Sequence, residues 1–186
     1  MGGNACFCRA SRHDILQLFA IYITLGLTKM PTAALPKSEV ACELLDRAIE
    51  LHLRGDSYYA ALHLGGAAEE ILSVCAREVL VAPGTFMKPA FDQIKEAIVA
   101  LSHPTSQREA RETEKWAHDR MSDAKNSVKH KRGPKDLVVQ FDATEESYDV
   151  IDRAISTYFQ LWSLLRLPYL PSIQEFDARH HADRRE

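Results

Sequence analysis

The residues with the clearest chemical potential in this chain occupy positions 125–130, which read Lys-Asn-Ser-Val-Lys-His. Asn126 and His130 are four residues apart, so on a continuous helix their side chains share one face. A histidine titrates near neutral pH and can transfer a proton, and a neighbouring cation can stabilise a phosphate. These residue types suit contact with a phosphodiester. The candidate catalytic residues are therefore His130, Asn126 and Lys125.

A cluster of basic residues surrounds this motif and forms a candidate nucleic-acid-binding surface. Its members are Lys125, Lys129, Lys131, Arg132 and Lys135. Phosphate contacts from lysine and arginine supply most of the affinity in nonspecific nucleic-acid binding. The net charge of the whole chain is −3, so contact with RNA must come from this local surface. The alternative is a solvated helix end whose basic residues complement the helix dipole.

Apolar residues recur at helical spacing through most of the chain after residue 37. The expected helices cover residues 38–53, 58–81, 88–101, 106–130 and 143–167. Glycine and proline mark most of the breaks between them, and no strand pattern of any length competes. The sequence therefore predicts an all-α fold, an antiparallel up-and-down bundle of four to five main helices that forms one domain over residues 38–167.

A pair of glycines, Gly65 and Gly66, lies in the middle of the second expected helix. Each costs about 1 kcal/mol relative to alanine, so we expect the backbone of another helix to approach closely there. The adjacent Glu69 and Glu70 are expected to pack against a basic residue of helix 106–130 and balance its charge. A metal site at His63 and Glu70 is the weaker alternative, because a di-metal bundle needs Glu-x-x-His motifs on two helices and this chain has none. We therefore expect no metal and no cofactor.

Helix 106–130 carries a narrow apolar seam that should face the core. Its members are Ala117, Met121, Ala124 and Val128. At about 100° per residue, Asn126 and His130 fall on the opposite side of the helix. We therefore expect the motif to look into solvent, into a groove or toward a partner subunit.

The two ends of the chain differ from the helical region. Residues 1–30 include an apolar run, 15–27, that is shorter than the roughly 20 residues a membrane span needs. A start assigned too early, with Met30 as the true start, is one interpretation of this extension; a signal or anchor and an ordinary helix are the others. Residues 168–186 are expected to form a polar C-terminal tail that is loose from Ser172 onward. The four cysteines lack a zinc-site pattern, so we expect a protein of the reducing cytoplasm with no stable membrane span.

The order of the helices, and a Lys-Asn-x-x-x-His motif just before the last one, resemble the HEPN superfamily over about residues 38–166. The resemblance implies a small helical bundle, usually a homodimer, whose active members are metal-independent endoribonucleases. It implies that His130 acts as general base or acid at the 2′-hydroxyl, that Asn126 orients the site and that residue 125 binds the scissile phosphate. Some members act as toxins paired with a cognate antitoxin protein, and others have lost catalysis.

Lys125 stands where active members of that superfamily generally have arginine. Lysine can place a charge on a phosphate but cannot reproduce the planar, bidentate fork of arginine. The leading hypothesis is therefore a protein that binds RNA or a nucleotide in a toxin–antitoxin or defence-type role without strong catalysis. An active endoribonuclease that leaves 2′,3′-cyclic phosphates and a dimerisation or interaction module are the two alternatives.

Overall fold

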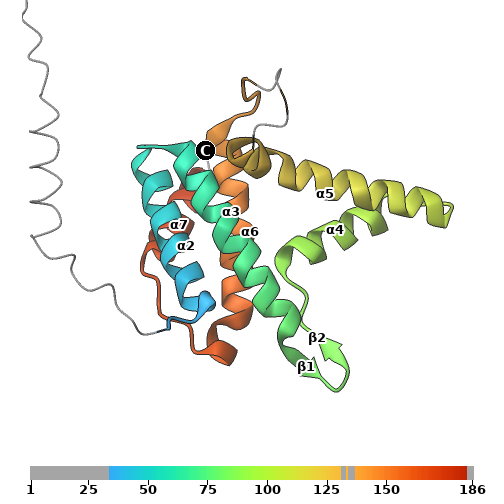
Figure 1. Cartoon of the computed structure of the whole chain (residues 1–186), viewed down its shortest axis with the longest axis horizontal. Helices are drawn as coiled ribbons and strands as arrows, with labels where there is room; N and C mark the ends of the chain where they lie inside the picture. The colour runs from blue at the N-terminus through green and yellow to red at the C-terminus, as the bar shows by residue number, and fades with distance from the viewer. Residues whose placement is uncertain (1–33, 131–132, 134–136, 184–186) are drawn as a thin grey trace, which may run out of the picture. The chain divides into compact units, whose positions relative to one another are not determined.

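The computed structural model describes residues 34–130, 133 and 137–183. The described residues form six helices and one very short hairpin. In chain order the elements are α2 (Lys37–Arg54), α3 (Tyr58–Glu78), β1 (Leu80–Ala82), β2 (Thr85–Phe86), α4 (Ala90–Leu101), α5 (Gln107–Lys129), α6 (Ala143–Leu165) and α7 (Ser172–Asp183). The fold is all-α, and the expected helical bundle is confirmed (Figure 1).

The core is built by α2, α3 and α6, with α3 in contact with both of the other two helices. Each of these helices contributes an apolar stripe at helical spacing. The largest fully buried apolar side chains include Leu45, Ile49, Leu72, Ile151, Tyr158 and Leu161. Side-chain caps fix where two of the three helices begin: the Ser57 hydroxyl accepts from the backbone N–H of Ala60, and the Asp142 carboxylate accepts from Thr144 and Glu145.

The C-terminal region differs from the expected loose tail, because residues 172–183 form α7. Ile173 and Phe176 are buried in the main core, and the Phe176 ring stacks on Tyr148 with 5.3 Å between centroids. Polar contacts tie the helix to α2: the Ser172 hydroxyl donates to Asp46, and Arg179 donates to the carbonyl of Leu53. The prediction of a loose tail was therefore wrong for this segment.

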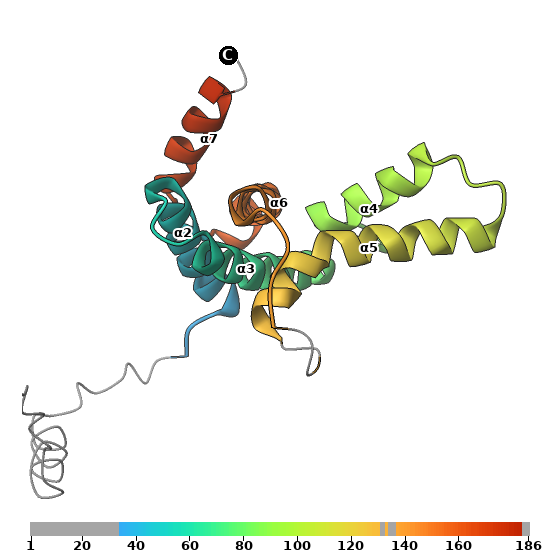
Figure 2. The ribbon, with the colours of Figure 1, turned by 90° about the horizontal axis from the view of Figure 1, so that it is seen from above.

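Helices α4 and α5 form a hairpin that extends away from α2, α3, α6 and α7 (Figures 1 and 2). At its base the backbone N–H of Ala90 donates to the Thr157 hydroxyl on α6 at 3.0 Å. Only Ala90 and Phe91 of α4 are buried. The C-terminal half of α5 returns to the bundle and packs on α3, which brings the 125–130 motif against the core helices.

Neighbouring helices pack closely against the glycine pair of α3. A Cβ at Gly65 would lie 3.1 Å from a side-chain carbon of Ile151 on α6, and a Cβ at Gly66 would lie 3.2 Å from Cβ of Lys125 on α5. The expected approach of another helix backbone is not observed, because the atoms nearest to both glycines belong to side chains. Gly66 thus makes room for the stem of a lysine.

Several helix boundaries differ from the sequence prediction by one to three residues. Helix α3 ends at Glu78, and the residues that follow pair as an antiparallel hairpin, Leu80 opposite Phe86. Helix α5 ends at Lys129 rather than at residue 130.

Among the described helices, none combines the length and apolar character needed to cross a membrane. The apolar run at 15–27 lies outside the described residues.

Candidate functional site

The motif lies at the C-terminal end of α5, and the helix stops within it. His130 follows the last helical residue with an extended backbone (φ −132°, ψ 129°), and its N–H donates to the carbonyl of Asn126 at 3.0 Å. Because residue 130 is not helical, the argument that Asn126 and His130 share a helical face does not extend to the His130 side chain. His130 is exposed, whereas Asn126 is half-buried.

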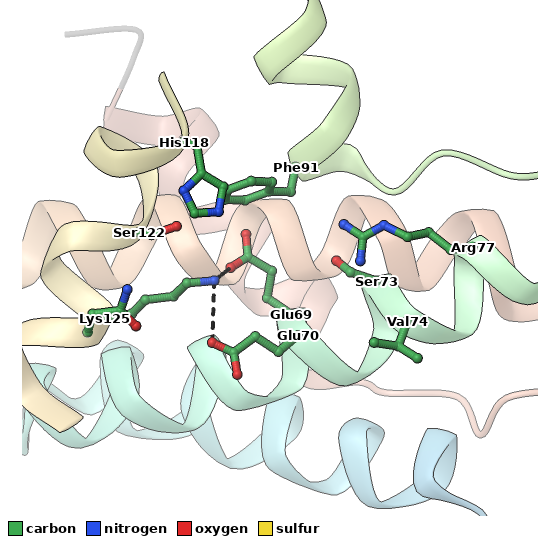
Figure 3. Close-up of a pocket in the computed structure, with 10 residues that line it drawn as sticks. Glu69, Glu70, Ser73, Val74, Arg77, Phe91, His118, Ser122 and Lys125 are labelled. Carbon is green, nitrogen blue, oxygen red and sulfur yellow. Dashed lines mark hydrogen bonds and ion pairs between the residues drawn. The ribbon is translucent and has the colours of Figure 1, made fainter. Parts of the chain in front are cut away.

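Lys125 is buried and lies against α3, so it does not face solvent. It is 6% exposed, and its Nζ donates to Oε2 of Glu69 at 2.6 Å (Figure 3). The aliphatic stem of the lysine lies over Gly66, where any side chain would crowd it. The charge of Lys125 is therefore matched inside the protein by a carboxylate.

Glu69 accepts from two cations and is only 1% exposed. Its Oε1 accepts from Nε of Arg153 on α6 at 2.6 Å, while its Oε2 accepts from Lys125. Arg153 also donates to the carbonyl of Met121 on α5, at 3.3 Å. One carboxylate of α3 thus joins α5 and α6. This confirms the expectation that an acid beside the glycine pair, Glu69, pairs with a basic residue of the motif helix, Lys125.

A more exposed acid extends this ion-pair network toward solvent. Oε1 of Glu70 lies 3.0 Å from Nζ of Lys129 and 3.7 Å from Nζ of Lys125. The network therefore contains three cations, Lys125, Lys129 and Arg153, against the two carboxylates of Glu69 and Glu70. The formal charge of these five side chains is therefore +1, and the Asp149 carboxylate lies within electrostatic reach of Arg153.

A pocket of about 400 Å³ opens beside this network between α3, α4 and α5 (Figure 3). We call it the α3–α5 pocket. Besides the network acids and Lys125, its lining includes Ser73, Arg77, Phe91, His118, Ser122 and Asn126. These side chains supply hydroxyl, amide, imidazole and guanidinium groups beside one buried aromatic ring.

Contacts within the α3–α5 pocket hold several of these groups in place. The rings of Phe91 and His118 meet edge to face with 5.5 Å between centroids, and Nζ of Lys125 lies 5.2 Å from the Phe91 centroid. Nε of Arg77 donates to Asp92 at 2.8 Å. The buried hydroxyl of Ser73 has no hydrogen-bond partner among the described residues.

His130 lines a different pocket, of about 450 Å³. The other lining residues are Ser127, Val128, Lys129, Leu137, Val138 and Val139. The structure therefore brings Lys125 and Asn126 to one pocket and His130 to another, so the three candidate catalytic residues do not share a site. Of the candidate nucleic-acid-binding residues, Lys131, Arg132 and Lys135 lie outside the described residues.

Sequence reasoning missed Arg153, Arg77, Phe91 and His118 as parts of this site. Arg153 had a usable signal, because it lies one helical turn after Val150 and so shares the apolar face of α6. A charged residue within a buried stripe calls for a buried partner of opposite charge. Arg77, Phe91 and His118 had no such signal, since their meeting depends on how the α4–α5 hairpin folds back on α3.

No group of three histidine, cysteine or acidic side chains that could hold a metal ion occurs among the described residues. Comparisons with protein-family models, with curated proteins and with solved structures found no match to the chain.

Proposed function

We propose that this chain is a HEPN-like helical protein that binds RNA or a nucleotide without cleaving it, at the α3–α5 pocket and the basic end of α5. The observation that carries the proposal is the position of Asn126 and Lys125 in a pocket beside an ion-pair network of three cations and two carboxylates. A role in a toxin–antitoxin or defence system rests on the resemblance in the sequence alone.

The size and lining of the pocket support a ligand of this class. A volume of about 400 Å³ falls within the range of small-molecule sites, about 300–1,000 Å³. The amide of Asn126 and the hydroxyl of Ser122 can donate to and accept from a base edge, and the exposed His118 ring can stack on a base. The net positive network favours the phosphate of such a ligand.

The same geometry argues against strong catalysis. A lysine that stabilises a scissile phosphate needs a charge free to meet it, whereas Nζ of Lys125 already contacts Glu69 at 2.6 Å. A general base must lie within hydrogen-bond reach of the proton it removes, and His130 lines a separate pocket. The arrangement therefore favours binding over the alternative, an endoribonuclease that uses His130.

Binding is tested with the full chain, a fluorescently labelled single-stranded RNA and a labelled mononucleotide, by anisotropy in EDTA. We expect Asn126→Ala to weaken binding by about tenfold, the value for loss of about 1.4 kcal/mol. Arg108→Ala is the matched control, because Arg108 is an exposed residue at the opposite end of α5. Equal affinity of the Asn126→Ala variant and the parent would overturn the proposed site.

Cleavage is tested on the same samples with a mixed RNA pool. We expect no 2′,3′-cyclic phosphate ends above the level of a His130→Ala control. Cyclic ends that appear only with the parent protein would establish the endoribonuclease instead.

A second candidate, the dimerisation module, is favoured by exposed apolar side chains on the α4–α5 hairpin. Leu101 and Trp116 are largely exposed there, and Ile94 is exposed as well. Large exposed apolar areas on soluble proteins commonly mark contact surfaces. Light scattering after gel filtration should show a dimer that Leu101→Glu with Trp116→Glu dissociates, whereas Leu137→Glu, a control at another exposed leucine, should leave it intact.

A further inference from the structure

A small pocket of about 110 Å³ lies between the C-terminal part of α6, the α6–α7 connection and α7, away from the α3–α5 pocket. We call it the aromatic pocket. The buried side chains of Leu170 and Ile173 belong to its lining, together with the rings of Phe159, Trp162 and Tyr169. Nothing in the proposed function uses these residues.

The three rings are about half exposed to solvent. Phe159, Trp162 and Tyr169 are between 44% and 57% exposed. Among the described residues, no ring contact joins any of the three to another, while Phe159 meets the buried Tyr158 edge to face at 5.4 Å. Since aromatic side chains gain from burial, π faces left open around a cavity are suited to a ligand.

The backbone that carries these rings is fixed. The hydroxyl of Tyr158 donates to the carbonyl of Pro168 at 2.7 Å, which ties the α6–α7 connection to α6. Helix α6 ends at Arg166 in the left-handed conformation (φ 53°), and the N–H of Leu167 donates to the carbonyl of Trp162 at 3.0 Å. Buried Leu170 and Ile173 then anchor the start of α7. The walls of the pocket are therefore preorganised.

The polar side chains that line the aromatic pocket include a carboxylate, which attracts a cation. Asp177 and Gln174 of α7 complete its lining. In the described part of the chain, Asp177 makes no ion pair, and the nearby Arg179 is directed to the carbonyl of Leu53 on α2. One carboxylate and three partly exposed aromatic rings thus line a mostly apolar space.

We propose that the aromatic pocket binds a small organic cation that carries a methylated or quaternary ammonium group. Such a cation is attracted to ring faces, most strongly to tryptophan, and its methyl groups tolerate an apolar lining. A metal ion or a bare ammonium group would lose hydration that two polar side chains cannot replace. A volume of about 110 Å³ fits a headgroup of this kind and excludes a nucleotide.

The test uses tryptophan fluorescence of the full chain. The sequence has two tryptophans, so Trp116→Phe leaves Trp162 as the single reporter. Choline is titrated at constant ionic strength against 3,3-dimethylbutan-1-ol, which has the same shape without the charge. We expect a saturable change in Trp162 emission with choline, and binding of the neutral alcohol at least about fivefold weaker. Equal affinity for the two compounds would overturn the proposal.

Two variants test whether the change in Trp162 emission comes from choline bound in the aromatic pocket. Asp177→Asn removes the charge with little change in shape, and Tyr169→Leu removes one ring; each should weaken choline binding at least about fivefold. Asp152→Asn, on an exposed position of α6, is the control. Thermal unfolding followed by circular dichroism shows that the variants are folded. Choline binding that neither pocket variant changes would also overturn the proposal.

The source of the ammonium group is distinguished by a second titration, with a short peptide that carries one trimethyllysine and its unmethylated counterpart. Tighter binding of the trimethyllysine peptide than of choline would identify a methylated protein segment as the ligand. Tighter binding of choline would identify a free small molecule. The absence of a saturable signal with both compounds would overturn the proposal.

Discussion

Replacing Glu69 by alanine leaves Lys125 and Arg153 buried without the carboxylate that both contact at 2.6 Å. Removing one member of a buried ion pair commonly costs about 3–5 kcal/mol, because an uncompensated charge remains. We expect a loss of that size in the free energy of unfolding for Glu69→Ala, measured in urea. Glu70→Ala is the control: its carboxylate is half-exposed, so its removal should cost less than about 1 kcal/mol. Similar losses for the two variants would contradict a structural role for Glu69.

His52 makes the stability of the fold depend on pH. The ring is buried, its Nδ1 lies 2.9 Å from the Ser147 hydroxyl, and burial lowers its pKa from 6.5 to about 4, with His180 and Arg179 adding repulsion. The unfolded chain therefore binds a proton more readily than the folded protein. The contribution of His52 is fully present above pH 6.5 and declines as the pH falls toward about 4.

The expected result is a steeper loss of stability between pH 6.5 and 4 in the parent than in His52→Gln, which cannot titrate. Urea unfolding at a series of pH values measures both curves. A uniform offset between them, with equal slopes, would show that the pKa of His52 is the same in the folded and unfolded states.

At the scale of the elements, α7 is held by few apolar side chains, so each should matter. Phe176 is buried and stacks on Tyr148. Truncation of a buried phenylalanine commonly costs about 3–5 kcal/mol. We expect Phe176→Ala to destabilise the protein by that amount in urea unfolding and to increase amide exchange along α7. Phe86→Ala, at an exposed residue of β2, should change stability by less than about 1 kcal/mol. Unchanged stability of Phe176→Ala would mean that α7 is not part of the core.

The helices that the sequence predicted are those with long apolar stripes and clear caps. The Asp142 cap of α6 is an example, since both the carboxylate and the apolar residues after it are visible in the sequence. The sequence did not predict helix α7, because its apolar stripe is very short. Its large apolar residues are Ile173 and Phe176, which lie three residues apart in a polar segment of the kind that is typical of a tail. Its helical state depends on a groove that exists only after α2 and α6 have packed.

The candidate site was predictable only in part, for a related reason. The sequence indicates that an acid next to the glycine pair needs a cation from the motif helix, and the structure supplies Lys125. The sequence does not indicate which basic residue of the motif helix pairs with this acid. In the resemblance to the HEPN superfamily, Lys125 occupies the position that binds the scissile phosphate, which requires it to reach the surface. The structure instead buries Lys125 against Gly66.

At the scale of the whole molecule, the net charge of −3 limits how RNA can bind. A negatively charged chain gains little from long-range attraction, so affinity must come from a few local contacts. In single-strand binding, the slope of log K against log salt is about −0.7 for each phosphate neutralised. The five side chains of the α3–α5 network have a formal charge of +1, whereas Lys131, Arg132 and Lys135 would add three positive charges.

The salt dependence of RNA binding therefore separates the pocket from the basic segment after α5. We expect the slope of the parent to fall to about −0.7 when Lys131, Arg132 and Lys135 are all changed to alanine. Changing Arg108, Arg111 and Lys115 to alanine removes the same charge from the exposed N-terminal half of α5, and that control should keep the slope of the parent. If both triple variants change the slope equally, the RNA responds to net charge alone and the end of α5 has no special part in binding. If neither changes it, the phosphate contacts lie elsewhere on the protein.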